Sequence, residues 1–71
     1  MKYQVTQSIT TAEGTANAIS IHEGDGKVPD SAKMEFHQIL ASAYANPAVT
    51  EATVTIMDVY GRQYNKEYIL R

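Results

Sequence analysis

Apolar and polar positions alternate in the first part of the chain, which is the pattern of a strand with one buried face. Val5 and Ile9 alternate with polar residues in a first run, and Ile19 and Ile21 alternate with small or polar residues in a second. A short stretch with glycine separates the two runs, so we expect the chain to reverse there. The pattern predicts a β-hairpin over about residues 2–22.

The turn of this hairpin lies between Thr11 and Gly14. Gly14 suits the left-handed position that closes a three-residue loop, because glycine has no Cβ to oppose a positive φ. The loop length sets the register of a hairpin and therefore the face that each side chain occupies. The cross-strand partners expected from a three-residue loop are Val5 with Ile21 and Ile9 with Asn17.

A helical periodicity occupies residues 30–46. Asp30 or Ser31 can cap the first turn, and Asn46 followed by Pro47 ends the helix. At roughly 100° per residue, one arc of this helix is apolar and predicts the face that packs on the core. The arc contains Ala32, Phe36, Ile39, Leu40 and Ala43.

A second, weaker apolar patch lies on the far side of the same helix. Surface alanines also favour a helix without any partner, so the patch alone does not define an interface. However, one core of this size supplies only about 3–5 kcal/mol of stability, which raises the expectation of a second copy. The candidate partner surface consists of Met34, His37, Ala41 and Ala45.

The last part of the chain predicts a second hairpin over about residues 51–70. Residues 52–60 are rich in Thr, Val and Ile, which favour a strand, and Gly61 ends it. A three-residue loop over residues 61–63 pairs this strand with residues 64–70. The partners expected from this loop are Tyr60 with Tyr64, Asp58 with Lys66, Ile56 with Tyr68, and Val54 with Leu70.

Two alternatives stay open for this segment. A two-residue turn at Gly61 and Arg62 places Ile56 opposite Glu67, which is a poorer cross-strand pair. The tyrosines of the segment are four residues apart, a spacing that also suits one face of a C-terminal helix.

The order hairpin, helix, hairpin predicts a single α+β domain of ββαββ type. Residues 23–29, which are rich in glycine and charge, form the loop between the first hairpin and the helix. A helix with one apolar arc needs one apolar surface, so we expect it to cover one face of a four-stranded antiparallel sheet. The other face is left for solvent or a partner and carries Thr53, Thr55, Met57 and Val59.

Composition limits the functions that this chain can have. With 71 residues, 44% of them hydrophobic, the chain is expected to be one globular domain. Its net charge of −2 gives no general attraction to phosphate, and without cysteine it has no thiol chemistry. No apolar run has the length of a signal peptide or a membrane span, so we expect a cytoplasmic protein with no membrane partner.

Few side chains suggest chemistry. His22 and His37 are the only ones expected to titrate near neutral pH, and neither has a second ligand at a spacing typical of metal sites. The surroundings of Gly24 and Gly26 match neither a calcium loop nor a phosphate loop. The sequence therefore predicts no enzyme activity, no metal and no cofactor; a hydrolase or metal enzyme would require the two histidine rings to converge.

Aromatic and basic residues interleave in the C-terminal hairpin, and stacking combined with phosphate contacts is how sheets bind single strands. Asp58 and Glu67 dilute the positive charge there, so single-stranded nucleic-acid binding is the alternative hypothesis. The main prediction is a non-catalytic interaction or accessory protein that acts as a homo-oligomer or with another protein. The residues of the alternative nucleic-acid surface are Tyr60, Arg62, Tyr64, Lys66 and Arg71.

Overall fold

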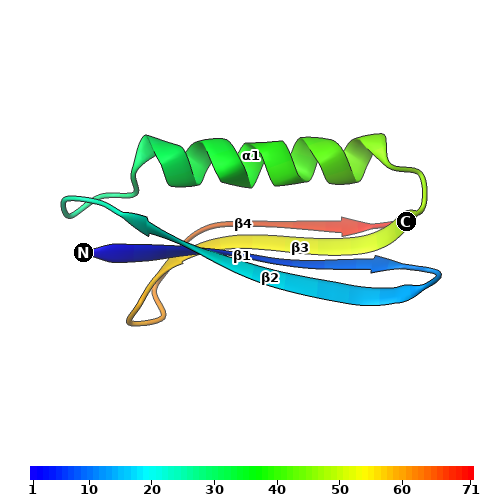
Figure 1. Cartoon of the computed structure of the whole chain (residues 1–71), viewed down its shortest axis with the longest axis horizontal. Helices are drawn as coiled ribbons and strands as arrows, with labels where there is room; N and C mark the ends of the chain where they lie inside the picture. Colours follow the sequence, from blue (N-terminus) through cyan, green and yellow to red (C-terminus); the bar gives the residue numbers. More distant parts are fainter.

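The computed structural model describes residues 1–71 and contains four strands and one helix. The strands form one antiparallel sheet with the order β2-β1-β3-β4, and the helix lies along one face of it (Figure 1). This arrangement confirms the predicted α+β class and the ββαββ order. In chain order, the elements are β1 (Lys2–Thr11), β2 (Gly14–Glu23), α1 (Asp30–Ala45), β3 (Val49–Asp58) and β4 (Gln63–Leu70).

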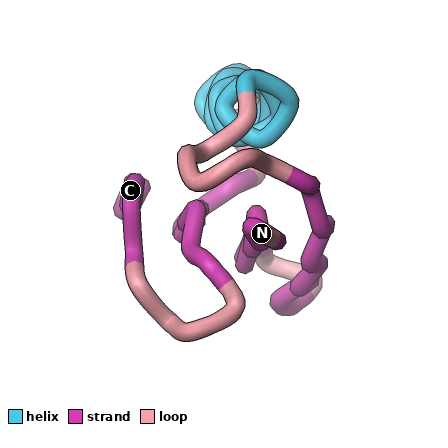
Figure 2. Tube along the Cα trace, turned by 90° about the vertical axis from the view of Figure 1, so that its left-hand side faces the viewer, coloured by secondary structure: helices cyan, strands magenta, loops and turns pink.

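The two hairpins are joined through β1 and β3, which pair with each other in the centre of the sheet. The edge strands are therefore β2 and β4. Seen along the strands in Figure 2, the helix lies on one side of the sheet, and no element covers the other side. The C-terminal segment is a strand, so the alternative of a C-terminal helix is wrong.

The hydrophobic core lies between α1 and the central strands. Four members of the predicted apolar arc of the helix are buried, and the fifth, Ile39, packs at the border of the core. Valines and isoleucines of β1 and β3 fill the sheet side, because β-branched side chains pack well on a pleated surface. The ten buried members are Val5, Ala32, Phe36, Leu40, Ala43, Val49, Ala52, Val54, Ile56 and Ile69.

The ends of α1 differ from the prediction in one respect. The residue before the helix is Pro29, whose extended backbone makes it the N-cap, and no side chain caps the first turn. The prediction that Asp30 or Ser31 serves as the cap is therefore wrong. The fixed φ of proline already directs the chain into the helix, and its carbonyl accepts from the amides of Ala32 and Lys33. At the other end Asn46 is the C-cap, as expected from the Asn-Pro sequence.

The predicted register of the N-terminal hairpin is wrong by one residue. Val5 pairs with Ser20, and Ile21 pairs with Gln4, because the loop contains only the two residues between Thr11 and Gly14. Gly14 has the expected positive φ of 128°, but it is the first residue of β2 rather than the last residue of the loop.

This shift of one residue turns the whole of β2 over, because side chains of a strand alternate between faces. Ile19 and Ile21 are 65% and 53% exposed on the face away from the helix. The helix side of β2 carries small or polar residues instead, namely Ala16, Ala18, Ser20 and His22.

The predicted register of the C-terminal hairpin, and its two-residue alternative, are also wrong. Ile56 lies opposite Asn65, and Ala52 lies opposite Ile69, so Ile69 enters the core while Tyr68 stays half exposed. The loop is longer than expected and includes residues 59–62, with a bulge where β3 and β4 begin to pair. Asp58 explains the loop length, because its backbone amide donates to the carbonyl of Arg62.

The connection between β2 and α1 packs closely where it passes Tyr3. Gly24 donates its amide to the carbonyl of Met1, and a Cβ at this position would lie 2.6 Å from the carbonyl oxygen of Lys27 and 2.9 Å from the ring of Tyr3. Only glycine fits there without a shift of the backbone.

The helix that follows is not long and apolar enough to cross a bilayer.

Candidate functional site

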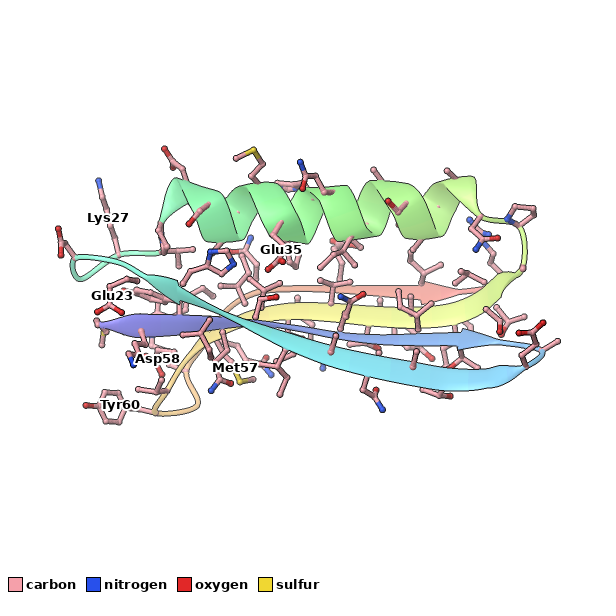
Figure 3. The ribbon with its side chains drawn as sticks, viewed as in Figure 1. Glu23, Lys27, Glu35, Met57, Asp58 and Tyr60 are labelled. Carbon is pink, nitrogen blue, oxygen red and sulfur yellow. The ribbon has the colours of Figure 1, made fainter.

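No helix covers the face of the sheet that turns away from α1, and we call it the open face. Met57 lies on this side in Figure 3, below the ribbon and away from the helix. Alternation along each strand places the other members beside it. They are Lys2, Gln4, Thr6, Ser8 and Thr10 of β1, Thr15, Asn17, Ile19, Ile21 and Glu23 of β2, Glu51, Thr53 and Thr55 of β3, and Lys66, Tyr68 and Leu70 of β4.

The composition of the open face is unusual for a surface exposed to water. Tyr68 and Leu70 are 49% and 71% exposed, and together with Ile19 and Ile21 they place large apolar side chains on both edge strands. The central strands contribute mainly hydroxyls, and the charged residues of the face are Lys2, Glu23, Glu51 and Lys66. Of the residues predicted on this face, Val59 alone lies elsewhere, in the loop after β3.

Tyr68 is fixed in place by a hydrogen bond to Glu51. Its hydroxyl donates to the Glu51 carboxylate, and this bond raises the pKa of Tyr68, with burial and the negative charge of Glu51 adding to the effect. The ring therefore stays neutral and oriented beside Thr53, its partner on β3. An aromatic ring that is already ordered loses little conformational entropy when a partner covers it.

The predicted partner surface on the helix is also uncovered. Met34 is 58% exposed, and Ala41 and Ala45 are exposed on the side of α1 that faces away from the core. His37 packs its ring edge-on against Phe36, with 5.3 Å between the ring centroids. Met34 is the only large aliphatic side chain in this patch, so it offers less apolar area than the open face.

The residues of the alternative nucleic-acid surface do not come together. Tyr60 projects from the loop after β3 (Figure 3), and Arg62 lies over the ring of Tyr64 at 5.3 Å. Lys66 is on the open face, whereas Arg71 lies just after the far end of β4, where its guanidinium donates to backbone carbonyls at the C-terminal end of α1. An eight-residue strand spans about 26 Å, so the two ends of this set are separated by the length of β4.

His22 forms a polar cluster that joins β2 to α1. Its Nε2 lies 2.9 Å from Glu35 Oε1, and its Nδ1 lies 3.0 Å from the hydroxyl of Ser31. Ser20 donates to the second oxygen of Glu35, which points from the helix toward the sheet in Figure 3. Sequence reasoning misses this cluster, because it depends on the register that places Ser20 and His22 on the helix side of β2.

The two histidines occupy different environments and do not form one site. His22 bonds to the helix beneath it, while His37 lies against Phe36 on α1. No three residues among the histidines, aspartates and glutamates are grouped so that they could hold a metal ion. The convergence that a two-histidine hydrolase or metal enzyme would require is therefore not found.

Asp58 forms a second polar cluster at the end of β3. Its carboxylate accepts from the amides of Tyr60 and Arg62 and from the hydroxyl of Tyr64, whose ring meets that of Tyr3 edge-on at 5.5 Å. Burial raises the pKa of Asp58, but these hydrogen bonds and the charge of Arg62 outweigh it, so the pKa is lowered. Burial and the bond to Asp58 raise the pKa of Tyr64. All of these contacts organise the loop between β3 and β4.

A polar groove of about 310 Å³ runs between α1 and β1. It is lined by Gln7, Glu35, Gln38, Ile39 and Ser42. Gln38 and Ser42 are exposed to water at its rim, and Glu35 is already bonded to Ser20 and His22.

Comparisons with known proteins give no relative for this chain: no family model, no curated protein and no solved structure matches it.

Proposed function

We propose that this chain is a non-catalytic cytoplasmic interaction protein that self-associates and uses the open face as its contact surface. The observation that carries the proposal is the set of exposed apolar side chains on that face, Ile19 and Ile21 on β2 and Tyr68 and Leu70 on β4. Extended apolar patches on small proteins mark interaction surfaces more often than they mark bare surface. The placement in the cytoplasm stays the expectation drawn from the sequence.

The dimensions of the open face also support the proposal. The molecule measures 39 × 19 × 15 Å, and the strands run along the longest axis in a view down the shortest (Figure 1). The open face therefore runs along the length of the molecule, with the exposed apolar side chains of β2 and β4 along its two borders. A second copy would also add to the limited stability of a core with ten buried residues.

Analytical ultracentrifugation from micromolar to millimolar concentration tests this function. We expect reversible self-association that is weakened at least about tenfold by Ile21→Lys, because a charge would be buried in the contact. Met34→Lys is the matched control, since Met34 is exposed to a similar extent but lies on the helix. Weakening by Met34→Lys alone would place the contact on the helix patch, and a monomer at every concentration would refute self-association.

Single-stranded nucleic-acid binding is the second candidate, and the observation in its favour is the exposed Tyr60 near the Arg62 and Tyr64 pair. It predicts retention of a labelled oligonucleotide at low salt that weakens in Arg62→Ala and Lys66→Ala. Absence of retention at low salt would eliminate this candidate. The net charge of −2 and the separation of Arg71 from the other residues of this surface favour the proposed interaction protein over nucleic-acid binding.

A further inference from the structure

The two edges of the sheet differ in how well they are protected against pairing with another strand. An edge strand has a row of unpaired amides and carbonyls, and natural proteins block such rows with charges, prolines or bulges. The edge strand β2 has ten residues, and its pairing with β1 continues without a bulge from Lys2 to Thr11. Between Thr15 and Ile21 it contains no charged residue and no proline.

The opposite edge, β4, carries the usual protection. It has eight residues, and Lys66 and Glu67 lie in its middle. A bulge interrupts its pairing with β3 between Ile56 and Met57. Only β2 is therefore open to strand addition.

Both faces of β2 are free enough for another strand to approach. All residues from Thr15 to Ile19 are exposed, on the helix side as well as on the open face. The helix reaches β2 only near its C-terminal end, through the bonds of Ser20 and His22 to Glu35.

We propose that a second copy of this chain pairs with β2 in antiparallel orientation and extends the sheet to eight strands. The proposal rests on the self-association proposed above and places the contact along the β2 edge, at the border of the open face that carries Ile19 and Ile21. A two-fold axis perpendicular to the sheet keeps the helices of both copies on the same side. Residues on the same face then pair with each other, because the axis does not turn the sheet over.

The charges at the ends of β2 select the register. With Ala18 on the axis, Glu23 would come opposite Glu13, in the turn that precedes β2 of the second copy, and like charges placed opposite each other destabilise a pair of strands. With Ser20 on the axis, fewer residues of β2 would pair. With Ile19 on the axis, residues 15–23 pair throughout, and Glu23 meets Thr15 of the second copy.

This register also explains the side chains of β2. Ile19 lies against Ile19 of the second copy, and Ile21 lies next to this pair on the same face. The open faces of the two copies therefore share one apolar centre. On the helix side, Ala16 and Ala18 are small and leave space between the two helices.

Two matched variants test the edge. Ala18→Lys adds a charge to the exposed helix side of β2, and Asn65→Lys adds the same charge to the exposed helix side of β4. We expect Ala18→Lys to weaken self-association at least about tenfold in analytical ultracentrifugation and Asn65→Lys to change it less than about twofold. Circular dichroism checks that both variants are folded.

The wild-type protein supplies an independent readout. We expect every second amide of β2 to exchange more slowly with deuterium at high than at low concentration, and an isotope-filtered NOE between the Ile19 methyls of labelled and unlabelled copies. Self-association with unchanged β2 exchange, or equal weakening by both variants, would overturn the edge pairing and leave the proposed function standing. A monomer at all concentrations would overturn both.

Discussion

Asp58 ends β3 and determines the shape of the loop that follows. Its carboxylate binds two amides of the loop and the hydroxyl of Tyr64, and its own amide donates to the carbonyl of Arg62. Aspartate commonly organises turns in this way, because its short side chain reaches the backbone two residues ahead. The Asp58 side chain therefore makes the loop longer than the position of Gly61 predicts, and the longer loop shifts the register of β4.

The lowered pKa of Asp58 predicts a specific acid sensitivity. Because the folded pKa lies below the ordinary value of 3.8, the carboxylate stabilises the fold above that pH, and this stabilisation is lost as the pH falls through the lowered value. We expect Asp58→Asn to lower the unfolding temperature clearly at about pH 6 and to differ much less from wild type at about pH 2. Thermal unfolding followed by circular dichroism measures both.

Asp25→Asn is the control for this experiment, since Asp25 is exposed in the loop before the helix. It should leave the unfolding temperature nearly unchanged at both pH values. If the difference in unfolding temperature between wild type and Asp58→Asn were the same at both pH values, it would contradict the assigned role of the carboxylate.

At the scale of elements, the residue that follows β4 stabilises the C-terminal end of α1. The guanidinium of Arg71 donates to the carbonyl of Tyr44 at 2.8 Å and to that of Asn46 at 3.0 Å. The last turn of α1 has no basic residue of its own, so the cation that favours a helix C-terminus comes from another element. Sequence inspection assigns Arg71 to a basic surface, because the distance along the chain hides this contact.

Replacing Arg71 by methionine should loosen this end of the helix. The bonds are exposed to water, so we expect a loss of only about 0.5–1 kcal/mol of unfolding free energy. Amides in the last turn of α1 should exchange faster with deuterium. Lys66→Met, on the exposed face of the same strand, should change neither quantity, and equal effects of the two variants would argue against the capping role.

At the scale of the whole molecule, the two faces of the sheet have opposite roles. The helix side contains the core, including Val54 and Ile56, which are fully buried. The open face contains large apolar side chains that no element covers, because the chain has only one helix. This asymmetry is the physical basis of the proposed self-association.

The same substitution on the two faces should therefore have different effects on the stability of the monomer. Ile56→Val removes a methylene group from the core and should cost about 0.5–1.5 kcal/mol. Ile21→Val, on the open face, should change the free energy of unfolding by less than about 0.5 kcal/mol. Urea unfolding of dilute protein measures both, and an equal cost would indicate that Ile21 lies in the core, as a three-residue loop would require.

Much of the fold can be predicted from the sequence, because the positions of strands and helix depend on local periodicity. The helix spans Asp30–Ala45 against an expected 30–46, and its apolar arc faces the core. The registers cannot be predicted, because each depends on the length of a loop. In the first hairpin a difference of one residue exchanges the two faces of β2.

The sequence by itself determined the order of elements, the helix face that packs on the sheet and the absence of thiol chemistry. Only the tertiary structure decided which side chains stay exposed, that His22 meets Glu35, and that Arg71 binds the end of the helix. The physical reason is the range of the interactions. Periodicity and turn residues act between neighbours in the chain, whereas register, edges and capping by distant residues exist only after the strands have paired.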